Sequence, residues 1–219
     1  MSTIRVSQLA VGSLAGSSSY FCDIERINAL YCRTHGYDYT VERLENHTQY
    51  RLNRHSAWEK VGHLRRHLQE CDFLLHLDVN SFFYNHVLSV REEWLSRLGA
   101  KLLYGAASGT LDEQKADKVH FNALLIRNTE QAHKLLKKWD ESSEMPGNAH
   151  LRYECNVDQC GVSHVFKDDI LIELEYPVRD GLSGQLLRNI GDIPHRERER
   201  FMTDLCGSQI MCRNCELRL

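Results

Sequence analysis

The sequence has few prolines, no long hydrophobic run and little net charge, and each scarcity narrows the class of protein. Three prolines, 42% hydrophobic and 26% charged residues are typical of a globular domain and leave no low-complexity linker. No segment approaches the roughly 18 to 20 apolar residues of a membrane span, and the N-terminus lacks a charged leader followed by an apolar run. We therefore expect a soluble, cytoplasmic protein without a membrane span.

The formal net charge of -3 gives no reason to expect a nucleic-acid partner, although local basic clusters could bind phosphates. The 219 residues suffice for one domain with a substantial core. Eight cysteines are scattered along the chain, several inside apolar periodic segments. This distribution favours reduced, mostly buried thiols over a disulfide framework.

Strand-like and helix-like segments alternate along the chain, which predicts an α/β fold. An apolar segment from Ile4 runs into a turn of glycines and serines, and a helical pattern follows that Gly36 can end. The next strand reads from Tyr37 to Arg43, and a strand-helix-strand order predicts parallel pairing. A capping box at Ser56 to Glu59 predicts the start of another helix.

The segment 71–80 contains the strongest candidate site. Phe73 to Leu77 is a short apolar run typical of a strand buried on both faces, and Asp78 and Asn80 follow directly. Open α/β sheets bind ligands beyond the carboxyl ends of their strands. Asp78 is therefore predicted either to face a ligand or to cap the turn at Ser81.

A hydrophobic strand that ends in Asp-x-Asp resembles the signature of GT-A glycosyltransferases, and here it reads Asp78-Val79-Asn80. Trp58-Glu59-Lys60 before this strand, Asn122 to Asn128 in a later strand, and the pair Asp158-Gln159 look like motifs of the Golgi galactosyltransferase, mannosyltransferase and xylosyltransferase family. The second motif departs from that family because Ala123-Leu124 replaces a small residue and glycine.

The resemblance implies a single GT-A, Rossmann-like domain with a mixed, mostly parallel sheet flanked by helices. Residues 1–175 would form the nucleotide-sugar-binding and catalytic core, and residues 176–219 a C-terminal segment that completes the site or packs on the core. The tail itself shows no clear periodicity and carries a run of charges at 196–200.

The chemistry that the resemblance implies is transfer of a hexose from a UDP- or GDP-sugar, with UDP favoured, to a glycan, protein or lipid acceptor. Mn²⁺ or Mg²⁺ would stabilise the leaving diphosphate as a Lewis acid. The implied metal ligands are Asp78, Asn80 and His195. Asn80 offers a neutral carbonyl where the signature has a carboxylate, which weakens cation binding, and His195 could equally be a solvated histidine beside the charge run.

The remaining candidate residues would hold the donor or face the acceptor. Asp158 could accept hydrogen bonds from sugar hydroxyls or act as general base beside Gln159, or simply cap a helix. Lys60 and Arg127 could neutralise phosphate charge or be ordinary exposed residues, and the glycine and serine turn could be a turn only. The predicted donor-binding residues are Gly12, Ser13, Lys60, Asp78, Val79, Asn122 and Arg127.

Three further interpretations stay open. A catalytically degenerate nucleotide-sugar-binding or interaction module would keep the fold without the metal chemistry. A DNA-base glucosyltransferase is suggested by a basic cluster, and the acidic net charge argues against it. Cys206, Cys212 and Cys215 with His195 could bind structural zinc, although only one Cys-x2-Cys pair is present. The basic cluster consists of Arg51, Arg54, Lys60, Arg65 and Arg66.

Overall fold

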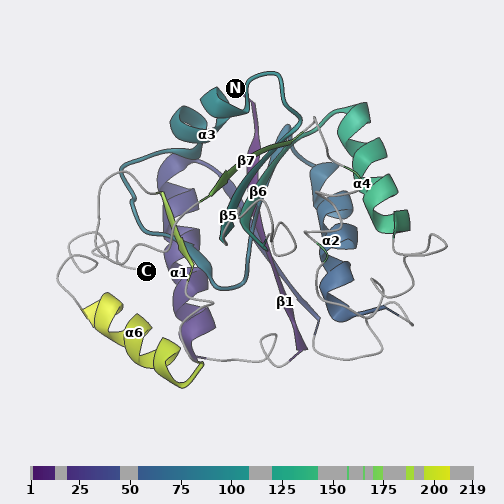
Figure 1. Cartoon of the computed structure of the whole chain (residues 1–219). Coiled ribbons are helices and arrows are strands. Elements are labelled where there is room, and N and C mark those ends of the chain that lie inside the picture. The colour runs from purple at the N-terminus through teal and green to yellow at the C-terminus, as the bar shows by residue number, and fades with distance from the viewer. Residues whose placement is uncertain are drawn as a thin grey trace.

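The structure is a computed structural model of the whole chain, and its helices and strands alternate as the sequence predicts (Figure 1). The residues that it describes are 2–12, 19–44, 54–108, 120–142, 157, 165, 170–174, 186–189 and 195–207. The elements are β1 (Ile4–Val11), α1 (Ser19–His35), β2 (Asp38–Leu44), the 3-10 turn η3 (Ser56–Trp58), α2 (Glu59–Leu68), β3 (Phe73–Leu77), β4 (Ser81–Phe83), α3 (Val90–Leu98), β5 (Leu103–Ser108), β6 (His120–Arg127), α4 (Glu130–Ser142), β7 (Ile170–Leu174), β8 (Leu187–Asn189) and α6 (His195–Gly207).

The central sheet is mixed and mostly parallel, which confirms the predicted fold class. Its strand order is β2-β1-β3-β6-β5-β7, in which β1 pairs in parallel with both β2 and β3, and β5 with β7. Only β6 runs antiparallel to its neighbours β3 and β5. A separate two-stranded antiparallel pair joins β4 to β8. The carboxyl ends of β1 and β3 therefore point to the same edge of the sheet.

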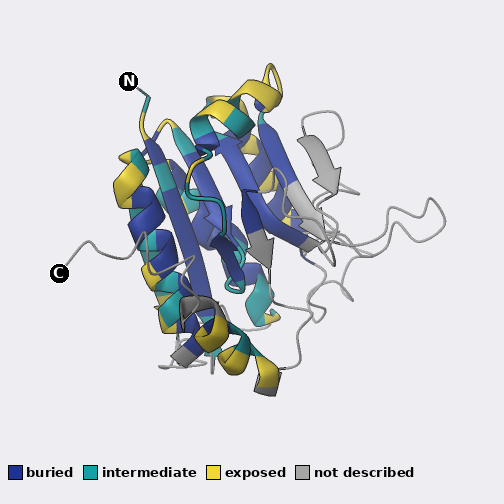
Figure 2. Cartoon of the chain, turned by 90° about the vertical axis from the view of Figure 1, so that its left-hand side faces the viewer, coloured by how far each residue is buried: buried dark blue, intermediate teal, exposed yellow. Residues whose placement is uncertain are grey.

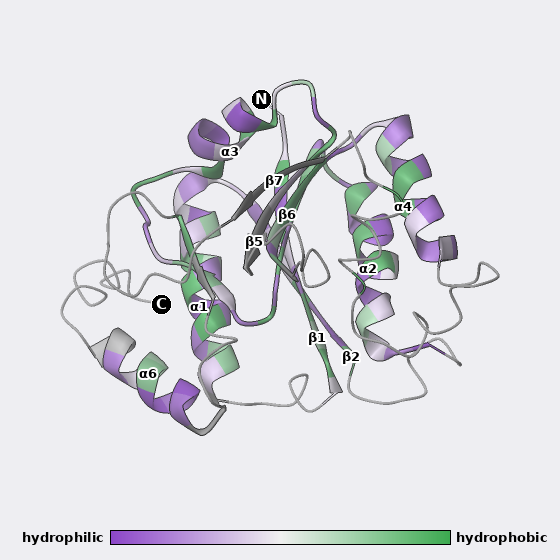
Figure 3. Ribbon diagram, viewed as in Figure 1, coloured by the Kyte–Doolittle hydropathy of each residue, from purple (hydrophilic) through white to green (hydrophobic). Residues whose placement is uncertain are grey.

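Helices cover both faces of this sheet (Figure 1). On one face, α2 and α4 pack through Leu64, Leu68 and Trp139 against Leu74 and Leu124 of the sheet. The opposite face is covered by α1 and α3, and the central strands β1 and β3 are mostly buried (Figure 2), whereas the edge strand β2 is partly exposed. The apolar side of α2 is turned toward the sheet and its polar side away from it (Figure 3). Burial of these apolar stripes is the main force that holds the layers together.

The ends of the helices follow local sequence signals, with one correction. Gly36, at φ 67°, ends α1 as predicted: its N–H donates to Arg33, and the N–H of Tyr37 donates to Cys32. The predicted capping box at Ser56 does not open α2. A 3-10 turn precedes this helix, and the side chain of His55 caps that turn by accepting a hydrogen bond from the N–H of Ala57.

Two C-terminal elements have no counterpart in the sequence-based expectation. The charge run 196–200 lies in α6, a 13-residue helix, and β8 pairs with β4. Met202 is the fully buried anchor of α6 and packs in one cluster with Tyr20 and Phe82. One fully buried apolar residue in a strongly charged segment does not make a periodic apolar pattern. Hydrophobic periodicity alone therefore does not predict this helix.

We expect Gly105→Ala to lower the free energy of unfolding by about 1 to 3 kcal/mol, because an added Cβ would overpack the core. That carbon would lie 2.7 Å from Cδ1 of Phe121 and even closer to Cε1. Urea unfolding measures the loss. Phe121→Leu should remove part of the clash, so the double variant should lose less stability than the two single losses combined. Strict additivity would contradict the proposed clash.

Candidate functional site

The residues that follow β3 form a tight turn at the carboxyl edge of the sheet. The N–H of Ser81 donates to the carbonyl of Asp78 at 2.9 Å, and the N–H of Asn80 donates to Asp78 Oδ1, also at 2.9 Å. The N–H of Asp78 donates to the carbonyl of Asn122 on β6 at 2.9 Å. The Asp78 carboxylate therefore has the local turn role that the sequence left open, and it is half-buried at the carboxyl end of a strand, where open α/β sheets bind their ligands.

Two buried amides hold this turn from below. Gln8 on β1 donates from Nε2 to the carbonyls of Asp78 (3.0 Å) and Ser81 (3.2 Å). Asn28 on α1 donates to Gln8 Oε1 at 3.0 Å and to the carbonyl of Ser81 at 3.1 Å, and its own oxygen accepts from the N–H of Phe83. Both amides are fully buried. Their hydrogen bonds fix the backbone of the turn relative to β1 and α1.

The sequence contains a signal for these two buried amides. Gln8 interrupts the apolar strand Ile4–Val11, and Asn28 lies on the inner stripe of α1, one turn after the buried Ile24. A polar side chain at a core position needs a hydrogen-bonding partner there. The Tyr39 hydroxyl also donates to Gln8 Oε1, at 2.5 Å. Burial raises the pKa of this hydroxyl, so it stays a hydrogen-bond donor.

The helix α6 brings a cation to the turn. Arg198 donates from Nη1 to Asn80 Oδ1 at 3.2 Å, and its guanidinium lies 5.9 Å from the ring centre of Tyr20 on α1. The predicted metal ligand His195 is the first residue of the same helix, one turn before Arg198. The structure does not describe the side chain of His195. Sequence reasoning missed Arg198 because its partner is 118 residues away.

A divalent cation fits this turn only in part. Asp78 offers a carboxylate, but the amide oxygen of Asn80 already accepts a hydrogen bond from the Arg198 guanidinium. A guanidinium beside the amide repels a second cation. Among the described residues, the one group of three side chains close enough to hold an ion lies elsewhere, at Glu42, His63 and His67. Metal binding by Asp78, Asn80 and His195 stays a prediction.

Several predicted donor-binding residues lie near the turn. Gly12 follows β1 at the same edge of the sheet, with φ 68°. Asn122 is buried and adjoins Asp78 through its carbonyl, and Val79 packs against the cluster of Tyr20 and Phe82. Lys60 lies in the first turn of α2, with its Nζ 5.8 Å from the ring centre of Phe121, the neighbour of Asn122. The structure thus places these four residues at or beside the edge where β1 and β3 end.

Arg127 does not join them. It pairs with Phe73 at the start of β3, which is the opposite end of that strand from Asp78. Its guanidinium donates to the carbonyl of Gly99 at 2.5 Å. This position argues against the predicted contact between Arg127 and a diphosphate at Asp78. Ser13, Asp158 and Gln159 lie outside the described residues.

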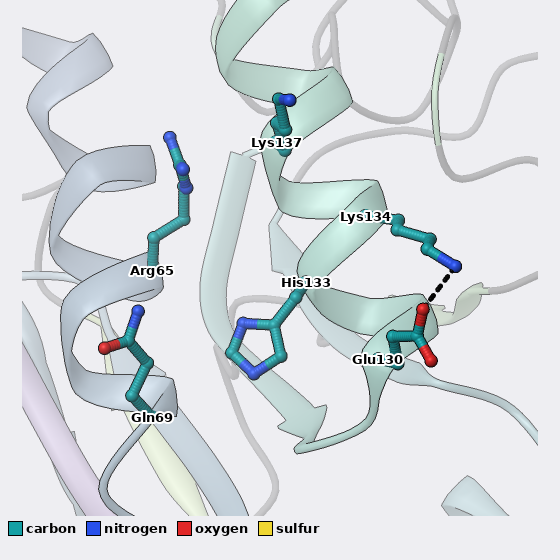
Figure 4. A pocket seen from close by; sticks show the side chains of 6 residues that line it. All are labelled: Arg65, Gln69, Glu130, His133, Lys134 and Lys137. Atoms are coloured by element: carbon teal, nitrogen blue, oxygen red, sulfur yellow. Dashed lines mark ion pairs between the residues drawn. The ribbon is translucent and has the colours of Figure 1, made fainter.

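A hollow of about 420 Å³ lies between α2 and α4 (Figure 4). Its rim is mostly basic, and one of its lysines, Lys134, forms an ion pair with Glu130 at 2.6 Å. Because α4 follows the end of β6 that pairs with Phe73, this hollow adjoins the edge opposite Asp78. It is therefore separate from the candidate site. The lining residues are Arg65, Gln69, Glu130, His133, Lys134 and Lys137.

The basic cluster that suggested a DNA-base glucosyltransferase is largely paired with acids. Arg54, which precedes η3, and Arg65 on α2 both donate to the Asp140 carboxylate on α4, at 2.7 and 2.9 Å. Arg66 donates to Glu42 at 2.6 Å. Arg51 lies outside the described residues. Three arginines of the cluster therefore serve internal ion pairs, and this arrangement gives no support to a nucleic-acid surface.

Comparison with known proteins connects this geometry to a fold. No protein-family model and no curated protein matches the sequence. The structure is similar to that of a glycosyltransferase involved in the glycosylation of the major capsid of PBCV-1, with a TM-score of 0.67 and 12% sequence identity over 92% of this chain and 99% of that chain. The galactosyltransferase LgtC in complex with donor and acceptor sugar analogs is more distant, with a TM-score of 0.48 and 15% identity over 77% of this chain and 72% of that chain.

The chain therefore has the GT-A glycosyltransferase fold, as the Asp78-Val79-Asn80 strand end predicted. At 12% identity the likeness establishes the fold and leaves the substrates open. Among the described residues, no helix is long and apolar enough to cross a membrane.

We expect Gln8→Met to destabilise the protein by about 1 to 3 kcal/mol, because the carbonyls of Asp78 and Ser81 would lose a buried donor. Methionine keeps the length of the side chain, so the change removes hydrogen bonds with little change in volume. Gln69→Met at the exposed C-cap of α2 is the control and should stay within about 0.5 kcal/mol. Equal unfolding midpoints in urea for both variants would contradict a structural role for Gln8.

Proposed function

We propose that this protein is a glycosyltransferase that moves a hexose from a nucleoside-diphosphate sugar to a glycan, protein or lipid acceptor. The observation that carries the proposal is the turn 78–81 at the carboxyl edge of β3 in a GT-A fold, held by Gln8 and Asn28. A carboxylate fixed at that edge lies where such sheets bind nucleotides. The sequence resemblance to the Golgi galactosyltransferase family favours a UDP-sugar as donor, and cysteines scattered through apolar segments favour action in the cytoplasm.

Loss of the diphosphate requires positive charge where the leaving oxygen develops negative charge. Arg198 is the best-placed cation among the described residues, because it already contacts Asn80 in the turn. Lys60 in the first turn of α2 is a second candidate. We propose that Arg198 binds the diphosphate, and that residues 176–219 complete the site in this way. A bound Mn²⁺ or Mg²⁺ at Asp78 would supply Lewis-acid stabilisation to the same phosphates.

A second candidate is the catalytically degenerate module that binds a nucleotide sugar without turnover. The contact between Asn80 and Arg198 favours it, because the usual second carboxylate is replaced by an amide that a guanidinium occupies. The two proposals differ in turnover and agree in nucleotide binding, so one assay separates them.

We expect the wild-type chain to hydrolyse at least one nucleotide sugar in a plate that holds UDP- and GDP-sugars with Mn²⁺, with Mg²⁺ or with a chelator. Asp78→Asn should reduce the rate by about 100-fold or more, since it removes the charge and keeps an oxygen for the Asn80 N–H. Thermal shift with the same nucleotides reports binding independently. A stabilising nucleotide without any turnover would favour the degenerate module, and neither binding nor turnover would overturn both proposals.

We expect Arg198→Gln to slow hydrolysis by about 100-fold and to weaken nucleotide binding, because it removes the cation nearest the turn. Arg200→Gln is the matched control on the same helix, since Arg200 is exposed and pairs with Asp204. Steady-state rates with and without Mn²⁺ measure both variants. Equal rates for the two variants would contradict a role for Arg198 in the site.

A further inference from the structure

A second polar cluster lies beneath α2, on the part of the sheet that contains β2 and β1. His63 and His67 are four residues apart on α2, so both rings lie on one face of the helix, and Glu42 reaches them from the edge strand β2. Glu42 Oε2 lies 2.7 Å from His63 Nδ1 and 3.7 Å from His67 Nε2. One potential ligand atom from each of the three side chains lies within 4.8 Å of the others.

These distances fit a small divalent ion. Zinc takes imidazole nitrogen at about 2.0 to 2.1 Å and carboxylate oxygen at about 2.0 to 2.2 Å, so neighbouring ligands of a tetrahedral ion lie about 3.3 Å apart. The two separations from Glu42 Oε2, 2.7 and 3.7 Å, lie on either side of this value. A shift of about half an ångström would bring each of these two separations to the tetrahedral value. The two histidine ligand atoms lie within 4.8 Å of each other, so they must also move together for an ion to bind both.

A further observation supports a ligand here. The ring nitrogens that face Glu42 are His63 Nδ1 and His67 Nε2. The second nitrogen of each ring, His63 Nε2 or His67 Nδ1, points elsewhere, is buried and has no hydrogen-bond partner among the described residues. The other carboxylate oxygen, Glu42 Oε1, accepts from Arg66 at 2.6 Å, which orients the carboxylate toward the histidines. His63 is fully buried, whereas the side chains of His67 and Glu42 are 18% and 25% exposed, so an ion can enter from solvent.

We propose that Glu42, His63 and His67 form a binding site for a divalent transition-metal ion, with zinc as its best match. Two imidazoles and one carboxylate suit zinc and its neighbours, while Mg²⁺ and Ca²⁺ prefer sites made of oxygen alone. The site lies at β2 and α2, apart from the metal predicted at Asp78, and it does not depend on the proposed function. An ion here would link the edge strand β2 to the helix whose first turn carries Lys60.

The test measures zinc bound to the whole chain after removal of metal with a chelator. We expect one Zn²⁺ per chain by elemental analysis and, at free Zn²⁺ about 100-fold above Kd, a rise in Tm of roughly 5 to 10 °C. His67→Gln and Glu42→Gln should each abolish both effects, and circular dichroism checks that they fold. His133→Gln is the control, because His133 lies on α4 and bonds Asn128, outside the cluster.

The C-terminal cysteines need their own control, since they could also take zinc. The double variant Cys212→Ser with Cys215→Ser should keep the zinc, and the Co²⁺-loaded protein should lack the absorption of a thiolate-bound ion. Absence of zinc from the wild type would overturn the proposal. So would zinc that His67→Gln and Glu42→Gln retain, or zinc that only the cysteine variant loses.

Discussion

Hydrogen bonds from two buried amides to the turn after β3 connect the core of this protein to its candidate site. Gln8 and Asn28 donate to the carbonyls of Asp78 and Ser81 from beneath the turn. Their partners in the turn are backbone atoms, so the position of the turn depends on β1 and α1, while the Asp78 carboxylate closes the turn locally. A buried amide without these partners would be costly, which couples the stability of the core to the geometry of the site.

The same turn also connects the core to the C-terminal part of the chain. Arg198 reaches Asn80 from α6, and Met202 anchors that helix beside Tyr20 and Phe82. The amide at residue 80 has an evident consequence here. A carboxylate would form an ion pair with Arg198, whereas the amide accepts a hydrogen bond from its guanidinium.

The charged residues on the other side of the sheet are arranged differently. Asp140 forms ion pairs with Arg54 and Arg65, and Glu42 contacts Arg66 and two histidines. Three of the five residues in the basic cluster are therefore paired with acids within the fold. A count of positive charges along the chain overestimates the charge that a partner would meet, because burial and pairing are decided by the packing of α2 on α4 and on β2.

The sequence determined the α/β architecture, because its local signals agree with one another. The apolar run at 73–77 became β3, Ile170–Leu174 became β7, Thr129 caps α4 through a hydrogen bond to Ala132, and Gly36 ends α1. Such signals act within a few residues, so they can be recognised without knowing the fold. The Asp78-Val79-Asn80 motif lies directly after β3, where the local signal of the apolar run places it.

Only the tertiary structure decided which side chains meet at that edge. Gln8, Asn28 and Arg198 contact the turn from 53 to 118 residues away in the sequence, in pairs that no local pattern links, while Arg127 lies at the far end of its strand. The sequence did not predict helix α6, because its stability depends on the burial of Met202 against α1 and β4. Contacts between distant segments depend on the completed packing of the sheet, so local sequence patterns do not predict them.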